Sequence, residues 1–143
     1  MNLTVRPVDV NYVHQTWPLV KPFLEEALQK GGDFPDWAAG YTIEHIQLFV
    51  VSGQWLLLVA VDEKNIVHGA GTVSLINYPL HRVAFFTTIG GKLISNQDTF
   101  EQLKALLKTH GATKIQGYCR EAMVRLLKRY NFETRNTLVE VLV

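Results

Sequence analysis

The sequence predicts a single α/β domain with one mixed sheet, an antiparallel meander of strands followed by β-α-β units, and helices on both faces. Residues 55–91 contain strand-length apolar segments separated by short turns, whereas residues 98–143 alternate helical and strand periodicities. The length of 143 residues suits one domain, and the chain shows no internal repeat and no interdomain linker. We therefore expect one domain over residues 1–143.

The first part of the chain predicts a short strand and a helix. Residues 3–7 alternate apolar and polar side chains, which is typical of a strand at an edge. Apolar residues at helical spacing over 17–28 then predict a helix. Pro18 and Pro22 are expected to start or kink this helix, and the glycine-containing stretch 31–36 to follow it as a loop.

A second helix is predicted after Thr42, which is a plausible N-cap, and Gly53 is expected to end it. A full capping box would require an acid or amide side chain at the position of His45. The apolar face of this helix consists of Ile43, Ile46, Phe49 and Val50. Such a face predicts packing against the sheet.

The centre of the chain predicts three antiparallel strands. The continuous apolar run 55–61 is typical of a strand buried on both faces, and the polar residues 62–65 form a hairpin turn after it. Further strands are expected over 66–76 and 83–89, and the pair Gly90–Gly91 ends the last of them.

The final part predicts alternating helices and strands. Asp98 is expected to cap a helix that Gly111 ends. A strand over 112–118, a helix over 120–130 and a last strand over 137–143 complete the order. This succession adds parallel units to the meander and places helices on both faces of the sheet.

Composition and charge exclude several classes of function. With 14 basic and 13 acidic residues the net charge is +1, which excludes electrostatically driven nucleic-acid binding by the molecule as a whole. No apolar run approaches the roughly 20 residues of a membrane span, and the N-terminus lacks the pattern of a signal peptide, so a cytoplasmic protein is expected. Cys119 is the single cysteine and the histidines lack metal-ligand spacing, so we expect no disulfide and no metal site.

The net charge conceals an asymmetry between the two halves. Residues 1–71 carry four basic against eight acidic residues, and residues 72–143 carry ten against five. The basic residues near the C-terminal end are Arg120, Arg125, Lys128, Arg129 and Arg135. This cluster is interpreted as the solvated face of a helix, and the alternatives are the rim of an anion site or a dock for an acidic partner.

Three stretches, together with the order of the predicted elements, are similar to one known family. The opening residues 5–9 (VRPVD) resemble its first strand, residues 57–69 its strand–turn–strand, and residues 120–133 its last helix and following turn. The chain thus resembles the GCN5-related N-acetyltransferase (GNAT) superfamily over its whole length, and the sheet predicted above would be a GNAT-like mixed sheet. The middle of the chain is most similar to small GNAT-like proteins encoded in phage and prophage genomes.

The resemblance implies acetyl-CoA as the cofactor, with its pyrophosphate held by a Q/R-x-x-G-x-G/A loop before the third helix. Such a loop offers free backbone N–H groups and the positive end of a helix dipole. The motif is missing here, and a carboxylate of Asp98 at the N-cap would repel a phosphate. Backbone N–H groups near the end of the preceding strand would polarise the thioester. The candidate cofactor-binding residues are Thr88, Ile89, Gly90, Gly91 and Lys92.

The resemblance also implies a tyrosine in the last helix as general acid and a base for the substrate amine. Leu127 occupies the tyrosine position. Tyr130, three residues later, serves only if the helix is rotated, and its alternative role is packing on Phe132. Candidate bases near the sheet centre are His68, His81 and Glu44, each with an ordinary structural role as the alternative. Tyr130 and His68 are the candidate catalytic residues.

Two hypotheses for the function follow. The first is a phage- or prophage-encoded relative of acyl-CoA-dependent N-acyltransferases with reduced or lost activity, which would act on an amine if active. The second is a non-catalytic virion component or protein-binding module built on the same fold. The expected location is the host cytoplasm or the virion. The oligomeric state stays open.

Overall fold

The computed structural model describes residues 2–30, 40–119 and 121–143. Its elements are β1 (Thr4–Pro7), the 3-10 helix η1 (Val10–Tyr12), α1 (Val13–Lys30), α2 (Ile43–Val51), β2 (Leu56–Val61), β3 (Val67–Asn77), β4 (Arg82–Gly91), α3 (Gln97–Thr109), β5 (Lys114–Gly117) and α4 (Glu121–Lys128). The loop predicted over 31–36 lies outside the described residues.

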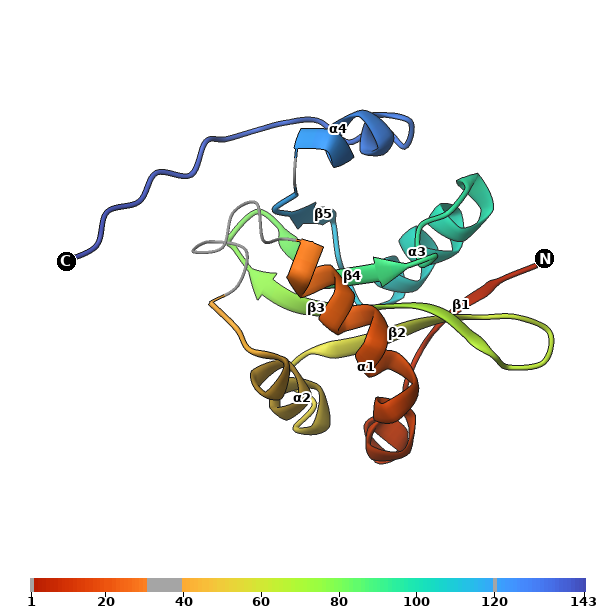
Figure 1. Cartoon of the computed structure of the whole chain (residues 1–143). Helices are drawn as coiled ribbons and strands as arrows, with labels where there is room; N and C mark the ends of the chain where they lie inside the picture. The colour runs from red at the N-terminus through yellow and green to blue at the C-terminus, as the bar shows by residue number, and fades with distance from the viewer. Residues whose placement is uncertain (1, 31–39, 120) are drawn as a thin grey trace.

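The strands form one sheet in the order β1-β2-β3-β4-β5. The pairs from β1 to β4 are antiparallel, and β5 lies parallel to β4. Helices α1 and α2 cover one face of the sheet and α3 covers the other (Figure 1). The predicted mixed sheet with helices on both faces is therefore confirmed.

Two buried clusters hold the helices on the sheet. On one face, Trp17, Val20 and Leu24 of α1 pack with alternate side chains of β2. On the other face, Leu103 and Leu107 of α3 pack with the intervening side chains of β2. The apolar run of β2 thus supplies both cores, as expected for a strand buried on two sides.

Pro18 and Pro22, which were expected to start or kink helix α1, both lie inside it. The chain enters α1 through η1, where the Asp9 carboxylate accepts a hydrogen bond from the N–H two residues later at 2.8 Å. Each proline removes one backbone donor from the helix. Burial of the apolar face of α1 offsets this loss.

Helix α2 begins as predicted at Thr42. The Thr42 hydroxyl accepts from the His45 N–H at 3.2 Å, and the Thr42 N–H donates to His45 Nδ1 at 3.0 Å. A histidine ring nitrogen therefore takes the part that a glutamate or glutamine plays in the usual capping box.

The last predicted strand is not formed. Residues 132–143 belong to no helix or strand, and they leave α4 as an extended segment that runs away from the body of the molecule (Figure 1). The apolar, β-branched composition of 137–143 suits a strand, but a strand requires a neighbour to which it can hydrogen-bond. No strand among the described residues pairs with this segment.

Candidate functional site

Strand β4 contains a bulge near its middle. Thr72 of β3 pairs with Thr88, whereas the next residue, Val73, pairs with Phe86, so Thr87 is an extra residue in β4. The Thr87 hydroxyl donates to the backbone carbonyl of Thr72 at 3.1 Å and lies 2.7 Å from the Thr72 hydroxyl. These contacts hold the extra residue in place, and a bulge of this kind bends its strand.

The sheet splits at this bulge. The parallel pairing of β4 with β5 ends at Phe86 and Gly117, immediately before the extra residue. Residues 88–91 continue to pair with β3, but no strand in the described part of the chain lies on their other side. Tyr118, the residue after β5, packs its ring against Phe85 at a centroid distance of 5.2 Å. The second half of β4 therefore presents one open edge.

Thr88 brings an unsatisfied polar group to this open edge. Its side chain is only 7% exposed, and its hydroxyl has no hydrogen-bond partner among the described residues. A buried hydroxyl without a partner costs about 1–3 kcal/mol. The neighbouring Ile89 is exposed. Thr88 thus carries a buried polar group without a partner, while Ile89 presents an apolar side chain to solvent on the other face of the strand.

Gly90 and Gly91 remain inside β4, where they pair with Ala70 and Gly69. A Cβ on Gly90 would collide with the backbone carbonyl of Phe23 in α1. Gly91 has a φ of +64°, and a Cβ there would lie 2.5 Å from a backbone oxygen of β3. Close packing of α1 and β3 therefore accounts for both glycines, which do not form an open loop.

His68 lies beside the end of β4. The N–H of Lys92 donates to the backbone carbonyl of His68 at 2.9 Å, while the Lys92 side chain is exposed. His68 Nε2 lies 2.8 Å from a carboxylate oxygen of Asp62. The structure thus brings the backbones of His68 and Lys92 together, and the contact with Asp62 orients the imidazole of His68. The role of His68 as a base stays a prediction.

Replacing Asp62 with asparagine is expected to reduce the loss of folding stability as the pH falls in the acid range. The hydrogen bond from His68, followed by that from the Ile66 N–H, lowers the pKa of Asp62 below its ordinary 3.8. The contribution of Asp62 is therefore complete above pH 3.8 and is lost as the pH falls through the lowered value. Urea unfolding across this range should show a shallower acid decline for Asp62→Asn than for the wild type.

The exposed acid Glu140 supplies the control for this prediction. Glu140→Gln removes a carboxylate from the extended C-terminal segment, where all the side chains are exposed. Its acid decline should match that of the wild type. An acid decline that is equally steep in Asp62→Asn would show that the pair with His68 contributes nothing to folding.

Helix α3 begins with a cap that differs from the prediction. Asn96, not Asp98, is the N-cap, and its side chain accepts from the Thr99 N–H at 2.9 Å. The Thr99 hydroxyl in turn accepts from the N–H groups of Asn96 and Ser95, at 3.2 and 3.0 Å. Thr99 is almost fully buried. Asn96 is the N-cap because Thr99 lies three residues later and completes the reciprocal pair of hydrogen bonds.

Asp98 instead lies in the first turn of α3. Its carboxylate accepts a hydrogen bond from the side chain of Gln102 at 2.9 Å. A negative charge at this place interacts favourably with the helix dipole. The stretch from Lys92 to His110 contains no glycine, so side chains surround this helix start. A second anion would meet three satisfied N–H groups and a carboxylate.

Solved structures of other proteins have the same fold as this chain. No family model and no curated protein matches the sequence. An aminoglycoside acetyltransferase, HMB0005, from an uncultured soil metagenomic sample aligns over 100% of this chain and 99% of its own, with 15% identity and a TM-score of 0.66. AAC(6')-Iy, solved with the bisubstrate analogue CoA-S-monomethyl-acetylneamine, also aligns over 100% of this chain and 99% of its own, with 9% identity and a TM-score of 0.66.

The fold is that of the GNAT acetyltransferases. A predicted acetyltransferase from Clostridium acetobutylicum, solved with acetyl-CoA, also aligns with 98% of this chain and 96% of its own, at 13% identity and a TM-score of 0.58. Sequence identities this low show the GNAT fold alone. Activity and ligands must therefore be argued from the residues of this chain.

Tyr130, the candidate general acid of the GNAT resemblance, packs against helix α3. Its ring lies 4.9 Å from the ring of Phe100, and Phe132 lies 5.6 Å from the same ring. The aromatic packing therefore centres on Phe100, near the start of α3. Tyr130 follows the end of α4 and is half-buried. Its role as an acid stays a prediction.

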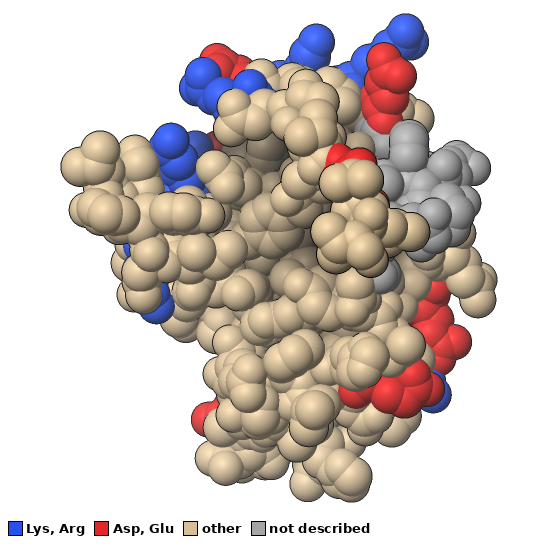
Figure 2. Space-filling view, turned by 90° about the vertical axis from the view of Figure 1, so that its left-hand side faces the viewer, with Lys and Arg blue, Asp and Glu red and all other residues tan. Residues whose placement is uncertain are grey.

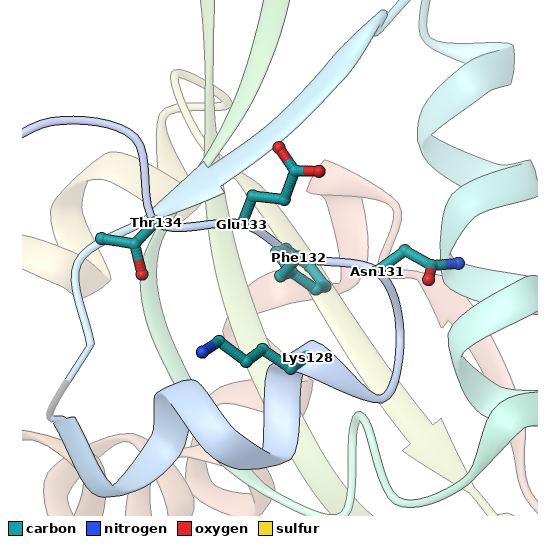
Figure 3. Close-up of a pocket in the computed structure, with 5 residues that line it drawn as sticks. All are labelled: Lys128, Asn131, Phe132, Glu133 and Thr134. Atoms are coloured by element: carbon teal, nitrogen blue, oxygen red, sulfur yellow. The ribbon is translucent and has the colours of Figure 1, made fainter.

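A hollow of about 470 Å³ lies at the end of α4 of this GNAT fold. It is lined by Lys128, Asn131, Phe132, Glu133 and Thr134 (Figure 3). The Lys128 amine and the Glu133 carboxylate point in different directions (Figure 3). The polar groups of this hollow do not converge on a common point, so they do not form a catalytic arrangement.

The predicted basic cluster is in part described. Arg125, Lys128 and Arg129 lie in or directly after α4, Arg135 pairs with Glu133 at 2.8 Å, and Arg120 lies outside the described residues. Figure 2 shows Lys and Arg side chains toward the upper end of the molecule, with acidic side chains among them. A mixed surface of this kind is typical of a solvated helix face.

Three further observations concern other chemistry. Within residues 2–30, 40–119 and 121–143, no group of three acidic, histidine or cysteine side chains gathers as metal ligands. No helix in the same residues is long and apolar enough to cross a bilayer. Burial raises the pKa of the Cys119 thiol, which disfavours the nucleophilic thiolate.

Two features of the site escaped prediction from sequence. The bulge at Thr87 leaves no mark in the sequence pattern, because the β-branched pair Thr87 and Thr88 suits a regular strand equally well. The cap of α3 did have a signal, since Asn96 and Thr99 have the spacing of a reciprocal cap. Asp98 obscured it, because aspartate is an equally good N-cap.

Proposed function

We propose that this GNAT-fold protein is a phage- or prophage-encoded relative of the acyl-CoA-dependent N-acyltransferases whose transferase activity is reduced or lost. One observation carries the proposal: side chains cap the start of α3, and the carboxylate of Asp98 lies in its first turn. The N–H groups of Ser95, Asn96 and Thr99 are already hydrogen-bonded. A pyrophosphate that used these N–H groups would have to break their bonds, and it would approach the carboxylate of Asp98.

The residues fit one end of acetyl-CoA and not the other. At the split in the sheet, the open backbone edge of residues 88–91 and the exposed side chain of Ile89 suit an amide-bearing, partly apolar chain such as pantetheine. At the start of α3, Asp98 repels phosphate, and only Lys92 offers a nearby opposite charge in the connecting turn. We therefore derive no transfer step through the cofactor.

The candidate catalytic side chains are held in other contacts. His68 is paired with Asp62, and Tyr130 is packed on Phe100. If some transfer survives, the acceptor is an amine. An aminoglycoside acetyltransferase of the same fold, meta-AAC0020, was solved with sisomicin. In that case His68 is the proposed base, and Tyr130 is the proposed acid.

The alternative is a non-catalytic virion component or protein-binding module. It is favoured by helix α4, which buries none of its residues, and by the apolar segment that follows it. Apolar surface of this extent is typical of an interaction site. Both hypotheses share the prediction that the phosphates of acetyl-CoA are not recognised.

Calorimetric titration with acetyl-CoA tests the proposal. We expect the wild type to bind at millimolar concentration or not at all. In the variant Asp98→Gly/Thr99→Gly the carboxylate and the cap are removed, and affinity should rise by about tenfold. The control Glu101→Gly, one turn further along, should not change it. Circular dichroism confirms that each variant is folded.

Micromolar binding by the wild type, abolished by Lys92→Glu, would contradict the proposal. It would show that Lys92 and the end of β4 hold the phosphates despite the closed cap. The enzyme hypothesis would then be favoured.

A further inference from the structure

Strand β1 forms one edge of the sheet, and its outer row of backbone groups faces away from β2. Among the described residues, β2 is the single strand neighbour of β1. The Val8 N–H, directly after β1, donates to the carbonyl of Leu57 in β2 at 2.8 Å. Because backbone groups alternate in direction along a strand, those of Leu3, Val5 and Pro7 point outward. A row of outward N–H and carbonyl groups is a template for pairing with another chain.

The side chain of Gln102, in α3, occupies this outer row. The Val5 N–H donates to Gln102 Oε1 at 2.9 Å, and Gln102 Nε2 donates to the Leu3 carbonyl at 3.0 Å. Nε2 also donates to a carboxylate oxygen of Asp98 at 2.9 Å. Since the carbonyl and the carboxylate only accept, and the N–H only donates, these partners permit one orientation of the amide. The side-chain amide thus makes the hydrogen bonds that a neighbouring strand would make.

Packing holds Gln102 at the edge. The next residue, Leu103, is buried in the same cluster as Leu3 and Val5, so α3 is fixed beside β1. Gln102 itself is half-buried. Pro7 protects the edge in a second way, because the next outward position then has no N–H to offer.

We propose that Gln102 closes the β1 edge against pairing with a second copy of the chain. Every copy carries the same strand, so two uncovered β1 edges could pair with each other about a two-fold axis. Such pairing requires the Val5 N–H and the Leu3 carbonyl, and Gln102 already binds both. The β1 edge is therefore a self-association surface that one side chain keeps closed. The proposal is independent of the proposed function, since it holds whether or not the chain binds acetyl-CoA.

Amide hydrogen exchange followed by NMR tests the hydrogen bonds. In Gln102→Leu the side chain keeps its approximate size but loses its polar groups. The Val5 N–H should then exchange about tenfold faster, while the Arg6 N–H, which points toward β2, should keep its rate. The control Gln97→Leu removes a glutamine of the same helix that bonds Glu101 instead, and it should change neither rate.

Two results of the exchange experiment would overturn the proposal. An unchanged rate at Val5 would show that Gln102 does not cover the edge. Equal acceleration at Val5 and Arg6 would show that β1 leaves the sheet, so that Gln102 clamps the strand and does not close its edge.

Sedimentation velocity tests the consequence for assembly. The double variant Gln102→Leu/Pro7→Val removes both protections of the edge. It should self-associate at concentrations at least about tenfold lower than the control Gln97→Leu/Pro7→Val, which keeps Gln102 in place. Circular dichroism confirms that both variants are folded. Equal self-association of the two double variants would contradict the closing role of Gln102.

Discussion

Replacing Gly90 with alanine is expected to lower the free energy of unfolding by about 3 kcal/mol. The added Cβ would collide with the backbone carbonyl of Phe23 in α1, and backbone yields less readily than a flexible side chain. α1 must therefore move off the end of β4, which opens the packing of Trp17, Val20 and Leu24. Urea unfolding followed by circular dichroism measures the loss.

Gly40 is the matched control for this prediction. A Cβ on Gly40 would meet no atom within 4 Å, so Gly40→Ala should change stability by no more than about 0.5 kcal/mol. If Gly90→Ala is as stable as Gly40→Ala, then α1 does not lie directly on β4. The packing explanation for Gly90 and Gly91 would then fail, and a ligand-binding role for them would be favoured.

Replacing Leu103 with alanine is expected to cost about 3 kcal/mol of folding free energy, from lost burial and from the cavity that remains. Leu103 is fully buried at the centre of the face that α3 presents to the sheet. Its neighbours Leu58 and Val73 come from two different strands, so the cavity cannot collapse easily. Thermal and urea unfolding provide the measurement.

Leu80, in the β3–β4 turn, is the control for Leu103. It is 88% exposed, so Leu80→Ala removes the same atoms without creating a cavity. Its effect should lie within about 0.5 kcal/mol. If Leu103→Ala and Leu80→Ala unfold at the same temperature and urea concentration, then α3 is not packed on the sheet as described.

The fold was predictable because strong local patterns agree with it. The run 55–61 has the length and composition of a strand covered on both faces, and α1 and α3 do cover it from opposite sides. Thr42 and Gly53 mark the ends of α2 through backbone chemistry that operates locally. Such signals do not depend on distant parts of the chain.

The structure departs from the sequence-based expectations where contacts between distant residues, or a competing N-cap residue, determine the local structure. For the prolines of α1 the sequence left open whether they start or kink the helix, and only the packed structure places both inside it. The start of α3 was assigned to Asp98, although Thr99 selects Asn96. The segment 137–143 has the composition of a strand, but strand formation also requires a partner, and no strand among the described residues pairs with it.

The candidate site was predictable in position but not in character. The sequence placed Thr88 to Lys92 at the end of a strand, and the structure agrees. It did not show that the sheet splits at Thr87, which exposes the edge beside Thr88. Nor did it show that Gly90 and Gly91 are required for packing against α1 and β3. These properties depend on residues far away in the chain.

The central claim is that the phosphate end of the acyl-CoA site has been closed while the open edge of β4 remains. Its most direct test compares calorimetric dissociation constants for acetyl-CoA and for S-acetylpantetheine, which lacks the phosphates. The closed cap of α3 predicts two weak constants with a ratio near unity. Acetyl-CoA that binds about 100-fold more tightly than S-acetylpantetheine would contradict the claim, because about 2.7 kcal/mol would then come from its phosphate-bearing half.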